Sequence, residues 1–121
     1  MIQSGNTPGD LPMYEYQALV VSAHDGDTIT ANIDLGFHVN ITETFRLSGI
    51  NSPEIVGPTK QLGIDARDFV RNLILNKTIL IKTEKDKQEK YGRYLAEVYL
   101  ADGRCLNDLL VENSLAVYQK Y

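Results

Sequence analysis

A strict alternation of apolar and polar residues between positions 29 and 35 constrains the fold most. Ile29, Ala31, Ile33 and Leu35 are separated by single residues, which are Thr30, Asn32 and Asp34. Successive side chains of a strand point to opposite faces, so a period of two indicates a strand with one face on a core and the other toward water. The segment therefore predicts a half-buried β-strand.

Further elements follow from shorter patterns along the chain. Strands are predicted at 17–22, 29–35, 39–47, 78–83 and 95–100, helices at 62–73 and 105–112, and a charged loop at 84–90. The 62–73 helix presents an apolar stripe of Leu62, Ala66, Phe69, Val70 and Leu73. Three strands, a helix, two strands and a short helix suit a mainly β fold, a small five-stranded barrel of the oligonucleotide-binding type. Residues 1–13 read as a flexible N-terminal tail and 14–121 as one domain.

The amino-acid composition excludes several classes of protein. The 121 residues include 12 Lys and Arg against 16 Asp and Glu, a net charge of −4, which excludes a protein that holds nucleic acid by bulk positive charge. Any polyanion must meet a local basic site or a bound cation. The single cysteine, Cys105, cannot form an internal disulfide. No apolar run reaches the ~20 residues of a membrane span. The N-terminus lacks a signal-peptide pattern, so we expect a cytoplasmic protein as given, with a secreted mature form as the alternative.

Three segments concentrate the polar groups that a phosphodiester requires. Asp25-Gly26-Asp27-Thr28 offers carboxylates, which hard cations such as calcium prefer. The segment 45–54 contains Arg46, Asn51 and Glu54, and the segment 90–93 ends in Arg93. A guanidinium can bind two phosphate oxygens at once. Each segment also has a structural interpretation: a turn, a surface pair of Arg46 with Glu43 or another carboxylate, a helix cap, or an exposed cation at a strand start.

Taken together and in this order, the motifs resemble the staphylococcal nuclease (thermonuclease) family. The matching residues run from about 16 to 116 and comprise Asp25-Gly26-Asp27-Thr28, Phe45-Arg46-Leu47 with Ser52-Pro53-Glu54, Gly63-Ile64-Asp65-Ala66, the segment 90–96, Ala101-Asp102-Gly103, and Leu106-Asn107. The resemblance implies a five-stranded oligonucleotide-binding barrel. It also implies a calcium-dependent enzyme that hydrolyses DNA, RNA or both and leaves 3′-phosphates.

The resemblance also implies roles for individual residues. Asp27 and Asn51 take the positions of side-chain calcium ligands, and Ser52 would contribute its backbone carbonyl. Glu54 matches the general base, and Arg46 and Arg93 match the arginines that bind the scissile phosphate. Two further positions, Lys90 and Tyr91, match residues that line the nucleotide pocket. The chemistry is coherent, since two guanidinium groups and a divalent cation stabilise the charge that develops during attack on a phosphodiester.

The chain departs from the family pattern at two places. Asn51 stands where well-studied members carry aspartate, which removes one negative charge and should lower calcium affinity. We also expect the family's C-terminal helix to be absent, with either a monomer or a weak homo-oligomer. The alternative function is a non-catalytic barrel that binds nucleic acid or a protein partner. Retention of Arg46, Glu54 and Arg93 favours catalysis.

Overall fold

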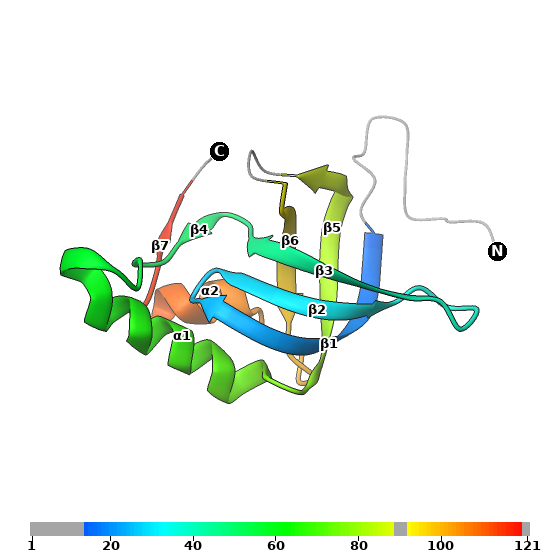
Figure 1. Ribbon diagram of the computed structural model, residues 1–121, viewed down its shortest axis with the longest axis horizontal. Coiled ribbons are helices and arrows are strands. Elements are labelled where there is room, and N and C mark those ends of the chain that lie inside the picture. Colours follow the sequence, from blue (N-terminus) through cyan, green and yellow to red (C-terminus); the bar gives the residue numbers. More distant parts are fainter. Residues whose placement is uncertain (1–13, 89–91, 120–121) are drawn as a thin grey trace.

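The computed structural model describes residues 14–88 and 92–119, which form a closed five-stranded barrel with two helices (Figure 1). The barrel strands, in the order β1-β2-β3-β6-β5, are β1 (Tyr14–Asp25), β2 (Thr28–Asp34), β3 (Asn40–Leu47), β6 (Tyr94–Tyr99) and β5 (Thr78–Gln88). The β3–β6 pair is parallel and the other pairs are antiparallel. Helix α1 (Lys60–Ile74), preceded by the 3₁₀ turn η1 (Gly57–Thr59), lies between β3 and β5 in the chain, and α2 (Leu106–Glu112) follows β6. The predicted barrel and its helix order are confirmed.

The predicted alternation of β2 is also confirmed. Ile29, Ala31 and Ile33 are buried, while Thr30 and Asn32 are half-buried on the other face, where their side chains bond Thr44 and Thr42 of β3. The barrel interior is filled by aliphatic side chains of all five strands, and each helix closes it with apolar residues, Val70 and Ile74 from α1, Leu106 and Leu110 from α2.

The buried face of α1 differs from the prediction at its first turn. Leu62 is 53% exposed, whereas Gly63 is buried with Ala66, Val70 and Ile74. The reason is the close approach of the helix to the loop before it: a Cβ at Gly63 would overlap the backbone carbonyl of Glu54. Leu62, the largest apolar residue of this turn, is therefore not the residue that packs against the loop.

Two other predictions about the elements were wrong or incomplete. The charged loop expected at 84–90 is strand as far as Gln88, because β5 continues past a register shift to pair Gln88 with Tyr94. A second sheet, not predicted, pairs β4 (Ile50–Asn51) with β7 (Val117–Tyr118). This short pairing holds the segment that contains Asn51 against the C-terminal part of the described chain.

Helix α1 and the last part of β1 are joined by a specific contact. Arg71 of α1 donates from Nε and Nη2 to the carbonyl oxygen of Ala23, at 3.2 and 3.0 Å. The β2–β3 hairpin extends along the long axis of the molecule to the end opposite the start of α1 (Figure 1). Across the described ranges, no helix combines the length and apolar character needed to cross a membrane.

Candidate active site

Asp27 lies in the turn between β1 and β2 and is 6% exposed. Its Oδ2 accepts the backbone N–H of Ser52 at 3.0 Å, and its Oδ1 accepts the hydroxyl of Thr28 at 3.2 Å. The Ser52 contact joins two loops that are 25 residues apart in sequence. Asp27 therefore fixes the first polar segment against the second.

Arg46 is paired with Asp27 in the interior. Its Nη2 lies 3.4 Å from Asp27 Oδ2, and both side chains are 9% exposed. The register of the β2–β3 ladder, with Thr28 directly opposite Arg46, places the two residues together. Arg46 also donates from Nη1 to the carbonyl of Leu47 at 2.7 Å. The surface interpretation of Arg46 is therefore wrong: this guanidinium is buried and held at several points.

Asn51 completes a convergence of oxygen atoms on Arg46. Its Oδ1 accepts a hydrogen bond from the same Nη2 at 3.3 Å, so an amide oxygen and a carboxylate oxygen from separate loops approach one cationic nitrogen. The hydroxyl of Ser52 is buried beside them with no hydrogen-bond partner among the described residues. Convergent hard oxygens and an unsatisfied buried hydroxyl fit a divalent cation with water in its shell.

The described residues contain no acidic or thiol-rich metal cluster. Within residues 14–88 and 92–119, no group of three or more His, Cys, Asp or Glu side chains is arranged to hold a metal ion. The oxygen donors that the structure does bring together are the Asp27 carboxylate and the Asn51 amide oxygen, which approach the same nitrogen of Arg46.

Arg93 is connected to this cluster through a hydroxyl. Its Nη1 donates to Thr28 Oγ1 at 2.9 Å, and the same hydroxyl donates to Asp27 Oδ1. Arg93 directly precedes the part of β6 that pairs in parallel with β3, where Phe45 lies opposite Tyr94. Of the two arginines predicted to bind phosphate, Arg46 lies in β3 and Arg93 directly precedes the neighbouring strand β6, and a chain of contacts through Thr28 and Asp27 joins them.

A second carboxylate crowds the same turn. Asp25 Oδ1 accepts the backbone N–H of Asp27 at 3.0 Å. Burial, together with a side-chain hydrogen bond and charge repulsion from Asp27, raises the pKa of Asp25 to about 6. The turn thus concentrates negative potential beside Arg46, although Arg46 neutralises only one of the two carboxylates directly.

Glu54 lies on the loop between β4 and η1, and its side chain is exposed. The backbone makes the contacts that hold it: its carbonyl accepts the hydroxyl of Thr59 at 2.9 Å and lies directly against Gly63 of α1. A carboxylate with this exposure can reach solvent water. One network joins five of the predicted residues, Asp27, Arg46, Asn51, Ser52 and Arg93. The Glu54 side chain is exposed on the loop that follows Ser52.

Two glycines permit this arrangement. A Cβ at Gly26 would lie 2.7 Å from Cβ of Ala66 and 2.9 Å from Oγ of Ser52, so the Asp25–Asp27 turn, α1 and the Ser52 loop meet at a point with no room for a side chain. Gly63 plays the same part for the Glu54 backbone. Helix α1 is therefore the support against which both acidic loops are positioned.

We expect Gly63→Ala to lower the free energy of unfolding by about 1–3 kcal/mol, the usual cost of overpacking. The methyl group would push the Glu54 carbonyl away from α1. Urea unfolding measures the loss of stability. Gln61→Ala, on the exposed side of the same helix, is the control and should change stability by less than about 0.5 kcal/mol. Equal stability of the two variants would contradict the packing argument.

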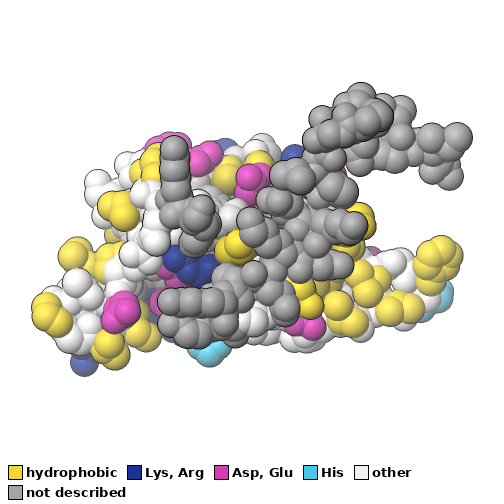
Figure 2. All heavy atoms as spheres, turned by 90° about the horizontal axis from the view of Figure 1, so that it is seen from above, with side chains coloured by type: hydrophobic (Ala, Val, Ile, Leu, Met, Phe, Trp, Pro, Cys, Tyr) yellow, Lys and Arg dark blue, Asp and Glu magenta, His cyan; other side chains and the backbone are white. Residues whose placement is uncertain are grey.

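Some residues of the site could be named from the sequence only as parts of motifs. Thr28 and Gly63 belong to the motifs, but nothing in the sequence assigns them these contacts, and Thr59 lies outside every motif. Lys90 and Tyr91, predicted for the nucleotide pocket, lie outside the described residues. In the space-filling view, Lys or Arg side chains with an acidic side chain beside them lie in a hollow near the middle of one face (Figure 2).

Comparisons with known proteins identify relatives of this chain. The family model described as staphylococcal nuclease homologue matches residues 44–121. The chain is 32% identical over 100 residues to a thermonuclease of Staphylococcus hyicus, covering 80% of this chain and 56% of that protein. It is 33% identical over 101 residues to a thermonuclease of Staphylococcus intermedius, with 81% and 56% covered.

A further relative is an uncharacterized endonuclease of Escherichia coli O157:H7, 33% identical over 103 residues, with 84% of this chain and 61% of that protein covered. The chain thus spans a little over half the length of these relatives. The family match covers more than half of the chain and includes Arg46, Asn51, Ser52, Glu54 and Arg93. With its barrel, its two arginines and its acidic turn, this chain belongs to the family of staphylococcal nuclease homologues.

Proposed function

We propose that this chain is a divalent-metal-dependent nuclease that hydrolyses phosphodiester bonds of DNA, RNA or both. The observation that supports this most directly is the network in which Asp27 contacts Arg46 and, through Thr28, Arg93. It combines two guanidinium groups with convergent oxygen ligands inside a protein of net charge −4. With a divalent cation bound, such a site becomes locally positive and can bind a polyanion although the whole molecule is acidic.

In the proposed reaction, Arg46 and Arg93 bind the non-bridging oxygens of the scissile phosphate. Their guanidinium charges remain in place as negative charge grows on the phosphate. Asp27, Asn51 and the Ser52 carbonyl would hold the metal ion, which when bound supplies further positive charge beside the phosphate. Calcium is the ion we propose, because the family resemblance implies it and oxygen donors are those that hard cations prefer.

Glu54 is the proposed general base. It takes a proton from a water molecule, whose oxygen attacks phosphorus while the bond from phosphorus to the 5′ oxygen breaks. The leaving 5′ oxygen gains a proton from solvent, and the other product keeps a 3′-phosphate. Lys90 and Tyr91 remain predicted contacts to the nucleotide next to this phosphate.

The experiment that tests the function is cleavage of single-stranded DNA and RNA by the purified chain with calcium, with magnesium, and with a chelator. We expect cleavage with calcium, loss of cleavage with chelator, and products that end in 3′-phosphate. Binding of nucleic acid without cleavage under every condition would overturn the proposal in favour of a non-catalytic barrel. Cleavage that continues in chelator would overturn the metal requirement alone.

Asn51 provides a second test, directed at the metal. We expect Asn51→Asp to tighten calcium binding by roughly tenfold, because a second carboxylate adds charge to the donor set. Calorimetric titration and the calcium concentration for half-maximal cleavage measure this. Asn40→Asp, an exposed position at the start of β3, adds the same charge away from the site and should leave calcium affinity unchanged. Equal calcium affinity of wild type and Asn51→Asp would remove Asn51 from the proposed ligands.

A further inference from the structure

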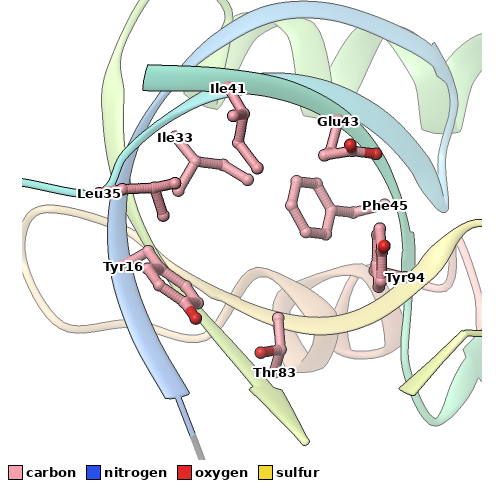
Figure 3. Close-up of a pocket in the computed structure, with 8 residues that line it drawn as sticks. All are labelled: Tyr16, Ile33, Leu35, Ile41, Glu43, Phe45, Thr83 and Tyr94. Carbon is pink, nitrogen blue, oxygen red and sulfur yellow. The ribbon is translucent and has the colours of Figure 1, made fainter. Parts of the chain in front are cut away.

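A cavity of about 170 Å³ lies within the barrel (Figure 3). Its walls carry three aromatic side chains, Tyr16, Phe45 and Tyr94, together with three aliphatic side chains of the β2–β3 hairpin. The aliphatic residues at its mouth, Leu35 and Ile41, are 38% and 42% exposed, so the cavity opens to solvent. An engineered cavity of about 150 Å³ holds benzene, so this one can hold one six-membered aromatic ring.

The cavity is separate from the proposed phosphate site but adjacent to it in the two strands that carry the arginines. Phe45 and Tyr94 directly neighbour Arg46 and Arg93, and they lie opposite each other in the β3–β6 pair, with ring centroids 6.3 Å apart. Because successive side chains of a strand face opposite sides, the aromatic rings face the cavity while Arg46 faces Asp27. The arginines and the cavity therefore lie on opposite sides of β3, and an oligonucleotide would need several nucleotides to contact both.

Two polar groups distinguish this cavity from a simple packing defect. Thr83 is 4% exposed, and its hydroxyl has no hydrogen-bond partner among the described residues. Such an unsatisfied buried group calls for an explanation, which a ligand would provide. Glu43, whose ionised carboxylate only accepts hydrogen bonds, lines the cavity on the side opposite Thr83 (Figure 3).

We propose that this cavity binds an unpaired pyrimidine base of the nucleic-acid substrate and prefers cytosine to thymine or uracil. The inference rests on the proposed function, since it assumes that the substrate is a nucleic acid. The Thr83 hydroxyl would donate to the O2 carbonyl, which all pyrimidines share. Glu43 would accept from the amino group of cytosine, whereas thymine and uracil present a carbonyl oxygen there, which the carboxylate repels.

Two general properties of nucleic-acid binding support this assignment. Oligonucleotide-binding barrels bind through strands two and three, and β2 and β3 contribute half of the residues that line the cavity, Ile33, Ile41, Glu43 and Phe45. Bases bound from single strands characteristically pack on aromatic side chains, of which this cavity has three.

The test is the affinity of labelled hexanucleotides, measured by fluorescence anisotropy in chelator so that the substrate stays intact. We expect the wild-type chain to bind oligo-dC tighter than oligo-dT by about fivefold to hundredfold, the range for one good base contact. Glu43→Gln should bring the two affinities together, because an amide can either donate or accept. Glu112→Gln, an exposed carboxylate on α2, should preserve the oligo-dC preference.

Thr83→Leu separates ligand binding from folding. The larger side chain fills the cavity and removes the unsatisfied hydroxyl, so the thermal midpoint should rise while oligo-dC affinity falls to that of an abasic hexamer. Equal binding of oligo-dC and oligo-dT by wild type, unchanged in Thr83→Leu, would overturn the base site even if the chain cleaves nucleic acid. Absence of both binding and cleavage in wild type would instead overturn the proposed function.

A second copy of the chain is the other conceivable occupant. Phe37, at the tip of the β2–β3 hairpin, is 96% exposed and could enter the cavity of a partner. A wild-type dimer in sedimentation that becomes monomeric in both Phe37→Ser and Thr83→Leu would overturn the base site in favour of this contact. A wild-type monomer that discriminates oligo-dC from oligo-dT supports the base site.

Discussion

Glu54→Gln is expected to lower the rate of phosphodiester cleavage by about 10²–10⁴-fold, the usual contribution of a general base. The amide keeps the length and shape of the carboxylate but cannot take a proton from water. Because the Glu54 side chain is exposed and its backbone makes the contacts to Thr59 and Gly63, the fold should be unchanged. Single-turnover cleavage at saturating substrate measures the chemical step, and anisotropy in chelator measures binding.

Binding and cleavage should separate in this variant. We expect the nucleic-acid affinity of Glu54→Gln to equal that of wild type or to rise slightly, since a negative charge is removed near the phosphate. Glu112→Gln is the matched control, because it removes one exposed carboxylate from α2 and should preserve the cleavage rate. A wild-type cleavage rate in Glu54→Gln would show that another group, or water alone, takes the proton.

The strands were predictable because their information is local. The alternation over 29–35 repeats at the period of a strand, and the burial of Ile29, Ala31 and Ile33 follows it. The end of β5 was not predictable in this way. A run rich in charge normally indicates a loop, but here the backbone of Gln88 still pairs with Tyr94 across the hairpin. The small β4–β7 sheet joins segments that are far apart in sequence, and two residues per strand leave no periodic signal.

The sequence motifs predicted which residues belong to the site, but they did not predict whether those residues are buried or what they contact. The motifs identify Asp27 and Arg46, yet an arginine in a strand is more often a surface residue, and only the Thr28–Arg46 register shows that this one is buried. The contact of α1 with the Glu54 loop depends on a close approach across the tertiary fold. The sequence pattern predicted Leu62 on the buried face of α1, because the pattern reflects only side-chain hydrophobicity. It contains no information on the space beside the Glu54 loop, which admits only a glycine.

The buried pair supports the second large expected effect. Arg46→Met should lower the free energy of unfolding in chelator by about 3–5 kcal/mol, because it leaves the Asp27 carboxylate buried without its counter-charge. The remaining hydrogen bonds from Ser52 and Thr28 satisfy both oxygens but supply no positive charge. Loss of the guanidinium should also reduce cleavage by at least about 10²-fold, the effect of removing one charge-stabilising donor. Urea unfolding and cleavage kinetics on the same preparations measure both.

Two comparisons determine whether burial of the Arg46–Asp27 pair causes the loss of stability. Arg104→Met removes a shorter ion pair, 2.7 Å from Asp102, but both partners are more than half exposed. Its effect on stability should stay below about 1 kcal/mol, as for surface pairs. The double variant Asp27→Asn with Arg46→Met removes both charges, so stability should recover relative to Arg46→Met while cleavage stays lost. Similar losses for Arg46→Met and Arg104→Met would contradict the argument, since the longer buried pair would then behave as an exposed one.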